Sequence, residues 1–215
     1  MRLFKPGFFV RLLYPEAFFR IRTTEKLLYL TFDDGPDPGS TPELLKILNK
    51  YNIKALFFCS GSAAEKYSDI TGKIIGRGHL IGNHGYNHLN GWTTSLIRYI
   101  DDVKKAAPLT SSFFFRPPYG RLRISQYLRL KKKYKIIFWD IMPYDFDPAF
   151  EGKNSLHILK KKIRPGSIIV FHDTQKSNAP EFIEDFILFA LNEGYKFDTL
   201  VHLRSTRRSG FFISE

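Results

Sequence analysis

The stretch "LYLTFDDGPD", residues 28–37, joins a strand built for burial to two adjacent carboxylates. Its apolar residues form a short run that is typical of a core strand, and Gly35 and Pro36 end that run. Asp33 and Asp34 therefore stand together at the carboxyl end of a buried strand. Two neighbouring negative charges at the edge of an apolar core are unfavourable unless something compensates them, so the pair predicts a charged partner.

Short runs rich in aromatic and β-branched residues alternate with helical patterns along the whole chain. Strands are predicted at 27–32, 55–60, 79–83, 112–115, 135–139, 167–171 and 196–201, and helices at 41–52, 62–76, 94–106, 122–133, 154–162 and 180–193. Because parallel strands need long crossover connections, this alternation predicts an α/β fold with a parallel sheet. The residue pattern alone leaves a closed barrel and an open doubly wound sheet as alternatives.

The length and the cysteine content predict a single domain without disulfides. The chain has 215 residues and a single cysteine, Cys59, which excludes an intramolecular disulfide and a cysteine-rich zinc site. Cys59 lies in an apolar run and is expected to be a small buried side chain. No linker or repeat interrupts the pattern, so we predict a basic, aromatic lead at residues 1–26 and one catalytic domain at residues 27–215.

The lead and the overall charge suggest an anionic partner. Arg11 and Pro15 interrupt the apolar residues of the lead, so it does not fit a cleavable signal peptide, and no apolar run is long enough to span a bilayer. The lead could rest on an anionic membrane surface or form a strap packed against the domain, which would make the protein cytoplasmic or peripheral to a membrane. The chain carries 33 Lys and Arg against 21 Asp and Glu, a net charge of +12. Since the usual nucleic-acid-binding modules are missing, a glycan is a better candidate partner than nucleic acid.

Polar and charged residues follow one predicted strand after another. Besides the aspartate pair, these are His84, His88, Arg116, Asp140, Asp145 and His172. In a β/α barrel all strands point the same way, so the loops after them gather at one end. This recurrence predicts an active site at the carboxyl end of the strands.

His84 and His88 predict a metal site. Four residues separate them, which on a helical turn places both rings on one side. Two histidines and one carboxylate, from Asp33 or Asp34, form a common open zinc site that leaves a position for water. One aspartate can then bind the cation, while its neighbour acts as a general base on the water that the cation has acidified.

Three further segments could complete such a site. Arg116 enters a proline-stiffened loop, where it can pair with a carboxylate and keep it ionised. The backbone N–H of Tyr119 in that loop could donate to an oxyanion. His172 ends a very apolar strand and is a candidate general acid, with Asp145 to fix its tautomer and raise its pKa.

These residues together resemble the polysaccharide deacetylase family, of the chitooligosaccharide deacetylase type of carbohydrate esterase. The segments "TFDDGP", "HGYNH", "RPPYG" and "FHD" occur in the family's order, and the resemblance covers roughly residues 27–201. It implies a distorted (β/α) barrel of about seven parallel strands. It also implies a divalent metal, zinc or else cobalt or nickel, bound by Asp34, His84 and His88.

The resemblance further assigns roles to single residues. It implies that Asp33 is the catalytic base, tethered by Arg116, and that His172 protonates the leaving amine. Asp145 would tune His172, and the Tyr119 backbone would help to bind the oxyanion. A separate set is expected to line the substrate: Pro117, Pro118, Trp139 and Thr174.

Three positions depart from the family's pattern. Gly85 stands where the family usually has Ser or Thr, which predicts a missing hydrogen bond in the metal loop. Phe146 replaces a common Trp after Asp145, and Thr174 replaces a leucine that commonly lines the acetyl pocket.

The sequence therefore predicts a metal-dependent hydrolase that removes N-linked acetyl groups from a peptidoglycan-like or chitin-like sugar polymer or oligomer. An O-deacetylase of an acetylated glycan and a catalytically silent glycan-binding module on the same fold are the alternatives. A phosphotransfer enzyme using the paired aspartates is a weaker one, since it leaves the two histidines unexplained and lacks a phosphate-binding glycine loop.

Overall fold

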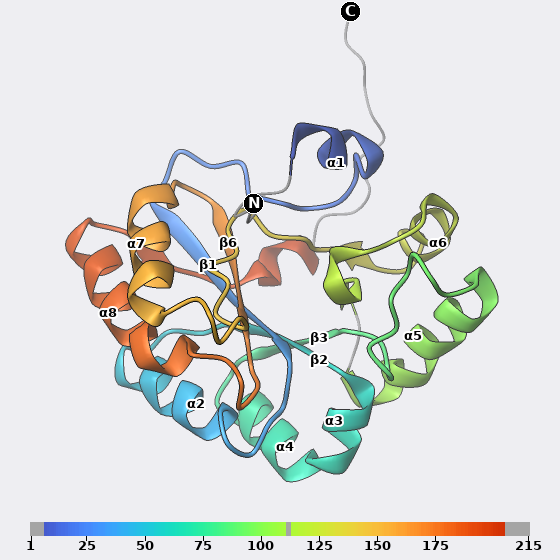
Figure 1. The fold of residues 1–215 in the computed structure, drawn as a ribbon, viewed down its shortest axis with the longest axis horizontal. Coiled ribbons are helices and arrows are strands. Elements are labelled where there is room, and N and C mark those ends of the chain that lie inside the picture. The colour runs from blue at the N-terminus through green and yellow to red at the C-terminus, as the bar shows by residue number, and fades with distance from the viewer. Residues whose placement is uncertain (1–6, 111–112, 205–215) are drawn as a thin grey trace, which may run out of the picture.

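The computed structural model describes residues 7–110 and 113–204, and it contains a curled parallel sheet ringed by helices (Figure 1). The strands follow the order β5-β4-β3-β2-β1-β6, and β7 pairs with the beginning of β1. Their bounds are β1 Leu27–Asp34, β2 Leu56–Cys59, β3 Leu80–Asn83, β4 Phe114–Phe115, β5 Lys135–Ile136, β6 Ser167–His172 and β7 Lys196–Phe197. All the pairings between these strands are parallel, as predicted.

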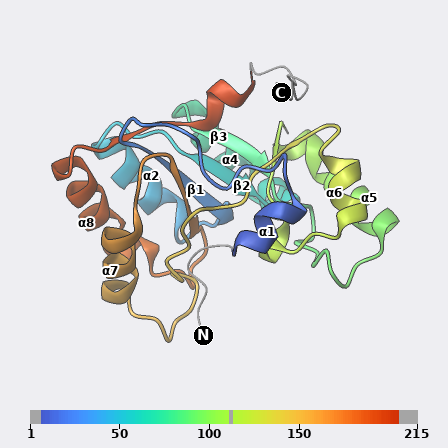
Figure 2. The same ribbon diagram turned by 90° about the horizontal axis from the view of Figure 1, so that it is seen from above.

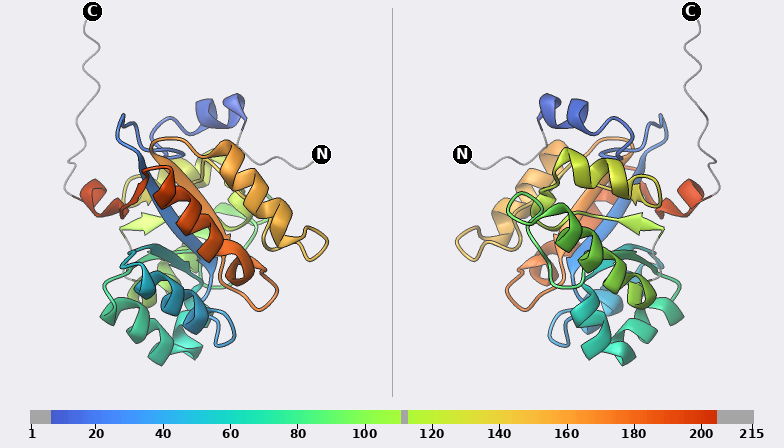
Figure 3. Two further views of the ribbon diagram at one scale, coloured as in Figure 1. Left: turned by 90° about the vertical axis from the view of Figure 1, so that its left-hand side faces the viewer. Right: turned by 90° about the vertical axis from the view of Figure 1, so that its right-hand side faces the viewer.

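The helices cover the outside of the sheet. They are α1 Phe8–Leu13, α2 Thr41–Lys50, α3 Gly61–Lys66, α4 Ser68–Gly76, α5 Leu96–Thr110, α6 Ile124–Leu130, α7 Gly152–Lys162 and α8 Ala179–Asn192, with short 3-10 helices at Pro118–Gly120 and Leu200–Arg204. Figure 3 shows α7 and α8 along one flank of the strands and α5 and α6 along the other. The covered faces explain why the strands read as continuous apolar runs rather than as alternating ones.

The segment that follows β5 brings the two edges of the sheet together. Ile141 forms a parallel bridge with Ile169 of β6, and its carbonyl accepts a hydrogen bond of 3.1 Å from the Val170 N–H. The sheet is therefore curled into a half-barrel rather than open and doubly wound. This confirms the predicted distorted barrel.

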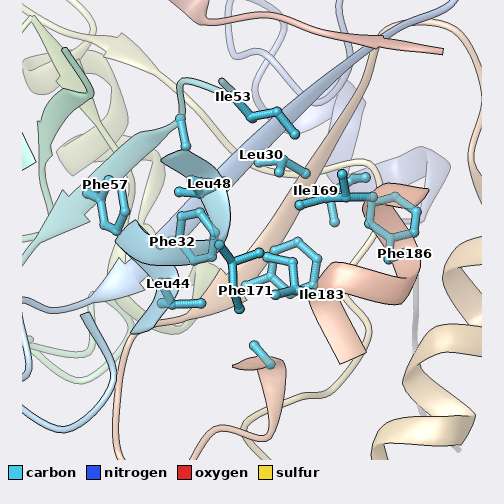
Figure 4. Packing of buried hydrophobic residues seen from close by; sticks show 14 of the residues in the cluster. Leu30, Phe32, Leu44, Leu48, Ile53, Phe57, Ile169, Phe171, Ile183 and Phe186 are labelled. Carbon is cyan, nitrogen blue, oxygen red and sulfur yellow. The ribbon is translucent and has the colours of Figure 1, made fainter. Parts of the chain in front are cut away.

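Aromatic side chains from neighbouring strands form the centre of the core (Figure 4). The ring centroid of Phe32 on β1 lies 4.8 Å from that of Phe57 on β2 and 5.6 Å from that of Phe171 on β6. Leu44 of α2 and Ile183 of α8 pack against this cluster from outside the sheet. Burying such side chains is worth about 1.5–3 kcal/mol each, so this core holds β1 firmly under the two aspartates.

Several element boundaries differ from the prediction. The helix expected at 62–76 is broken at Tyr67, whose φ of −119° and ψ of 51° are not helical. The helix predicted at 41–52 begins at Thr41 but already ends at Lys50, and Ser40 is its N-cap residue. The strands β4, β5 and β7 are shorter than expected, and position 112 of the predicted fourth strand lies outside the described residues.

The described part of the N-terminal lead is a strap. Figures 1 and 2 place α1 between α7 and α6, and the chain then runs along the end of the sheet. Tyr14 and Phe19 are buried, with ring centroids 5.2 and 4.7 Å from that of Phe138. The Phe18 N–H donates to the Ile136 carbonyl over 2.9 Å.

These contacts do not test two other predictions for the lead, its boundary with the domain and its binding to a membrane. Residues 1–6 lie outside the described part, and the boundary between residues 26 and 27 and the anionic membrane surface stay predictions. Within the described residues, no helix combines the length and apolarity that crossing a bilayer would need.

Asp140 does not belong with the site residues. Its carboxylate accepts hydrogen bonds from Arg164 over 2.9 Å and from the Ser167 hydroxyl over 2.9 Å, and Arg11 also donates to it over 3.1 Å. Ser167 begins β6, whereas His172 ends it. The grouping of Asp140 with the residues at the carboxyl end is therefore wrong, because the segment after β5 runs parallel to β6 and Asp140 lies beside the beginning of that strand.

Candidate active site

The strand register aligns the residues that precede the functional loops. Asp34 pairs with Cys59 on β2, Cys59 with Asn83 on β3, and Asn83 with Phe115 on β4. On the other side of β1, Asp33 pairs with His172 on β6. The side chains that were predicted from separate motifs therefore emerge along one edge of the sheet, as the barrel argument requires.

Asp34, His84 and His88 form the candidate metal centre. One ligand atom from each of them lies within 4.8 Å of the others. The Asp34 Oδ1 atom is 3.0 Å from the Nε2 atom of His88 and 3.5 Å from that of His84. His84 is buried, and its Nδ1 atom lies 2.9 Å from the Arg116 carbonyl, which can only accept. Nδ1 therefore carries the proton, and Nε2 offers a lone pair toward Asp34.

The Asp34 carboxylate fits a cation. Its Oδ1 atom is inaccessible to solvent, and among the described residues it accepts no hydrogen bond of normal geometry. Burial opposes ionisation, but the imidazoles of His84 and His88 outweigh burial and hold the pKa of Asp34 well below its ordinary value. An ionised oxygen without a donor, facing two imidazole nitrogens, is a donor set that suits a divalent transition metal.

The backbone at this centre is strained. Asp34 has a φ of 78° and His88 a φ of 54°, and Tyr119 nearby has a φ of 59°. Such left-handed conformations cost non-glycine residues about 1–3 kcal/mol each and are found mainly where function requires them. The Asp34 conformation is fixed by the Ser60 hydroxyl, which donates to the Asp34 carbonyl over 3.1 Å.

Asp33 lies beside this centre and is fixed by a buried arginine. Arg116 is fully buried, and its Nη1 atom donates to Asp33 Oδ1 over 2.6 Å. The same guanidinium donates to Thr31 Oγ1 and to the carbonyls of Ile137 and Phe138. Asp33 Oδ2 remains directed to the centre, 4.0 Å from His84 Nε2. One oxygen of Asp33 is thus tethered, and the other is available to accept a proton.

His172 and Asp145 form the opposite side of the site. The His172 Nδ1 atom lies 3.1 Å from Asp145 Oδ1, and the His172 backbone N–H donates to Asp145 Oδ2 over 2.6 Å. Ser177 fixes this carboxylate with a further hydrogen bond of 2.7 Å. Burial lowers the pKa of His172, but the charge of Asp145 and those of Asp34 and Asp33 overcome it and raise the pKa to about 9.

The loop that carries His84 and His88 is held in place by hydrogen bonds that do not involve position 85, where the family usually has serine or threonine. Asp102 of α5 accepts hydrogen bonds from the Tyr86 N–H over 2.8 Å and from the Asn87 side chain over 2.7 Å. Gly85 has a φ of 74°, and a Cβ atom there would lie 2.9 Å from the Asp102 carboxylate. The glycine therefore lets Asp102 approach the loop and take over its support.

Asp173 supports the loop after the aspartate pair. It is the last residue of "FHD", but the sequence pattern indicated no role for it. It is buried, and its carboxylate accepts hydrogen bonds from the hydroxyls of Ser40 and Thr41, the latter over 2.7 Å. Its backbone N–H donates to the Asp33 carbonyl over 2.8 Å. Asp173 therefore joins β6 to the loop after the aspartate pair. Asp102 had no comparable signal, because it lies inside an ordinary helical pattern.

The residues expected to line the substrate are buried or partly buried. Pro117 and Pro118 are buried, and Trp139 packs against Gly120. Thr174 is partly buried, and its carbonyl accepts the Ser177 N–H. Their contact with substrate, and the oxyanion role of the Tyr119 backbone, remain predictions. The Tyr119 ring is exposed and lies 4.4 Å from the His88 ring.

Comparison with known proteins agrees with this geometry. The family model of the polysaccharide deacetylases matches residues 20–136. A chitooligosaccharide deacetylase of Azorhizobium caulinodans is 34% identical over 164 residues, which are 72% of this chain and 77% of that protein. The chain belongs to the polysaccharide deacetylase family. Another relative is a peptidoglycan-N-acetylglucosamine deacetylase of Bacillus cereus. It is 30% identical over 189 residues, which are 83% of this chain and 68% of that protein.

Structural similarity extends to a member without activity. The crystal structure of a carbohydrate esterase family 4 pseudoenzyme from Bacillus anthracis has a TM-score of 0.78 and 26% identity, and the match covers 86% of this chain and 67% of that chain. The deacetylase family is therefore one of hydrolases that also includes pseudoenzymes. The side chains of the site are therefore the evidence on which this member is assigned to the hydrolases or to the pseudoenzymes.

Proposed function

We propose that the protein is a metal-dependent hydrolase that removes N-linked acetyl groups from an N-acetylated sugar polymer or oligomer of the peptidoglycan or chitin type. The observation that carries the proposal is the convergence of the Asp34, His84 and His88 triad with a tethered carboxylate and a charged imidazole. A binding module would need neither of these last two groups.

Asp34, His84 and His88 would hold the metal, and zinc is the cation that this donor set suits best. When bound, the cation would supply Lewis acidity toward water and the acetyl carbonyl. Asp33 would take the proton of the attacking water on Oδ2, because Arg116 holds its Oδ1 atom. The Tyr119 N–H would donate to the oxyanion.

His172 would supply the proton that the leaving nitrogen needs. The Nδ1–H of the imidazolium would keep its proton and donate a hydrogen bond to Asp145, and the proton on Nε2 would go to the leaving nitrogen. The ring of Phe146 packs edge-on against it, with centroids 4.7 Å apart and an interplanar angle of 62°, where the family often has a tryptophan. Phe146 would limit the access of water to this proton.

The test is acetate release from N-acetylglucosamine oligomers and from peptidoglycan fragments by the zinc-loaded protein. Activity should require the metal and should be lost in Asp33→Asn. Activity that survives both the chelation of metal and Asp33→Asn would contradict the mechanism.

Two related functions are distinguished by the same measurements. Release of acetate from O-acetylated glycans alone would indicate an O-deacetylase, since an ester can be hydrolysed by the same groups. Glycan binding without acetate release under any metal would indicate a silent module, which similarity to a pseudoenzyme makes worth testing. The intact base and acid favour the enzyme over the module.

A further inference from the structure

A strip of exposed side chains leads away from the candidate metal centre. The Tyr119 ring lies 4.4 Å from that of His88, and the Arg121 guanidinium carbon lies 5.9 Å from the Tyr119 ring centroid. The same carbon lies 5.1 Å from the ring centroid of Trp92. The guanidinium therefore lies between two aromatic rings, one of which touches a predicted metal ligand.

Both rings are exposed. Trp92 has 56% of its surface exposed and Tyr119 has 60%. A single exposed aromatic side chain needs no explanation, but two that flank one cation beside an active site form an amphipathic surface suited to sugar. Within the described part of the chain, the side-chain contacts of Arg121 are those with the two rings, and no carboxylate pairs with it, so its forked donors are available to a ligand.

The loop that carries Trp92 is held in place. The Trp92 N–H donates to Asn90 Oδ1 over 3.0 Å, and the Trp92 carbonyl accepts a hydrogen bond of 3.0 Å from Arg123 Nε. The buried Gln126 donates to the Gly91 carbonyl over 3.0 Å. These bonds fix the backbone at Trp92, so only the side-chain torsions of the indole remain free. The exposed indole is therefore part of a fixed surface.

The loop also approaches the arginine closely. A Cβ atom at Gly91 would lie 2.3 Å from the Arg121 carbonyl oxygen, so only glycine allows the two segments to meet in this way. The contact fixes the indole and the guanidinium relative to each other. The strip is therefore assembled by two segments, 90–95 and 119–126, that lie apart in the sequence.

We propose that Trp92 and Arg121 form a specificity subsite that selects a glycan carrying a carboxylate near the N-acetyl group to be removed. The indole would support the apolar face of a neighbouring sugar ring, and the guanidinium would bind the carboxylate with charge-assisted hydrogen bonds. The net charge of +12 favours the approach of such an anionic polymer. The inference rests on the proposed deacetylase function and names its substrate class.

The test measures binding separately from catalysis. Metal-free protein is titrated by calorimetry with a peptide-free oligomer of alternating N-acetylglucosamine and N-acetylmuramic acid, and with the same oligomer after reduction of its carboxyl groups to alcohols. Wild-type protein should bind the carboxylated oligomer about tenfold more tightly, as one charge-assisted hydrogen-bond pair of about 1.4 kcal/mol implies. The preference should shrink as salt rises.

Variants assign the preference to the strip. Arg121→Gln should abolish it, whereas Arg129→Gln, which removes an exposed charge from α6, should retain it. Trp92→Ala should weaken the binding of both oligomers by a similar factor, and Trp92→Phe should restore most of it. Equal wild-type affinity for the two oligomers, or the same loss of preference in Arg129→Gln as in Arg121→Gln, would overturn the subsite.

Acetate release separates this inference from the proposed function. A zinc-loaded enzyme that deacetylates both oligomers with equal kcat/KM would retain the proposed function and overturn the subsite. A protein that shows the Arg121-dependent binding preference but releases no acetate would retain the subsite and overturn the proposed function.

Discussion

Replacing Asp145 by asparagine tests the proton-donating role of His172. The amide oxygen can still accept the hydrogen bonds that Asp145 Oδ2 receives from the His172 N–H and from Ser177, but the negative charge is lost. That charge opposes the burial that lowers the His172 pKa and helps to raise it to about 9. Without it, burial is opposed only by Asp34 and Asp33, so the pKa should fall toward its ordinary value of about 6.5.

The size of the effect follows from these values. At pH 8, a group with a pKa of about 9 is about nine-tenths protonated, and one with a pKa of about 6.5 is about 3% protonated. Acetate release by Asp145→Asn should therefore fall by up to about 30-fold at pH 8, while the loss should shrink to less than about twofold at pH 6. Asp147→Asn, which removes a charge from the same loop, is the control and should keep the wild-type profile.

The pH profile of kcat then shows whether Asp145 acts through its charge or by holding the His172 ring. If the variant loses the same factor at pH 6 and at pH 8, Asp145 acts by holding the ring and not through its charge. A basic limb that stays near pH 9 in the variant would refute the electrostatic argument outright.

Stability gives a second readout that needs no substrate. Because the folded-state pKa of His172 is raised, its contribution is complete below about pH 6.5 and is lost as the pH rises through about 9. The difference between a pKa of about 6.5 and one of about 9 corresponds to about 3 kcal/mol. Urea unfolding of the metal-free protein should show this loss between pH 6 and pH 10, and the loss should be smaller in Asp145→Asn, where only Asp34 and Asp33 still raise the pKa.

Three further substitutions test the supports of the site. Arg116→Met should lower the free energy of unfolding by about 3–5 kcal/mol in urea, because Asp33 would keep a buried charge without its partner, and a loss below 1 kcal/mol would contradict this. Asp102→Ala should weaken zinc binding by about 10–100-fold in a chelator competition, since it supports the ligand loop; unchanged affinity would show that the loop stands without it. Gly85→Ala should lower the melting temperature, whereas Gly72→Ala, with open space around it in α4, should leave it equal or higher.

The parallel sheet and most of the site could be read from the sequence for one physical reason. Chemistry-bearing residues such as Asp34 and His84 follow apolar runs directly, and in a parallel sheet the ends of such runs must meet. The register of Asp33 with His172 is a consequence of that arrangement. The curling of the sheet could not be read in this way, because it depends on where residues 137–141 turn.

Other features lay outside the reach of local patterns. Asp140 follows a predicted strand, yet it pairs with Arg164, because the chain runs parallel to β6 and passes its beginning at Asp140 before it reaches its end at Asp145. Asp102 supports the metal loop from the side of a helix, where its spacing is that of any polar face. Such long-range partners are determined by packing, and neither propensity nor motif order records them.

The position of a bound cation tests the central claim most directly. Crystals of the protein soaked with zinc, with data collected at the zinc absorption edge, would locate the metal without reference to activity. We expect one strong anomalous peak about 2.0–2.2 Å from the Asp34 carboxylate and from the Nε2 atoms of His84 and His88. A peak that lacks either histidine, or that is bound through Asp33 in place of Asp34, would contradict it.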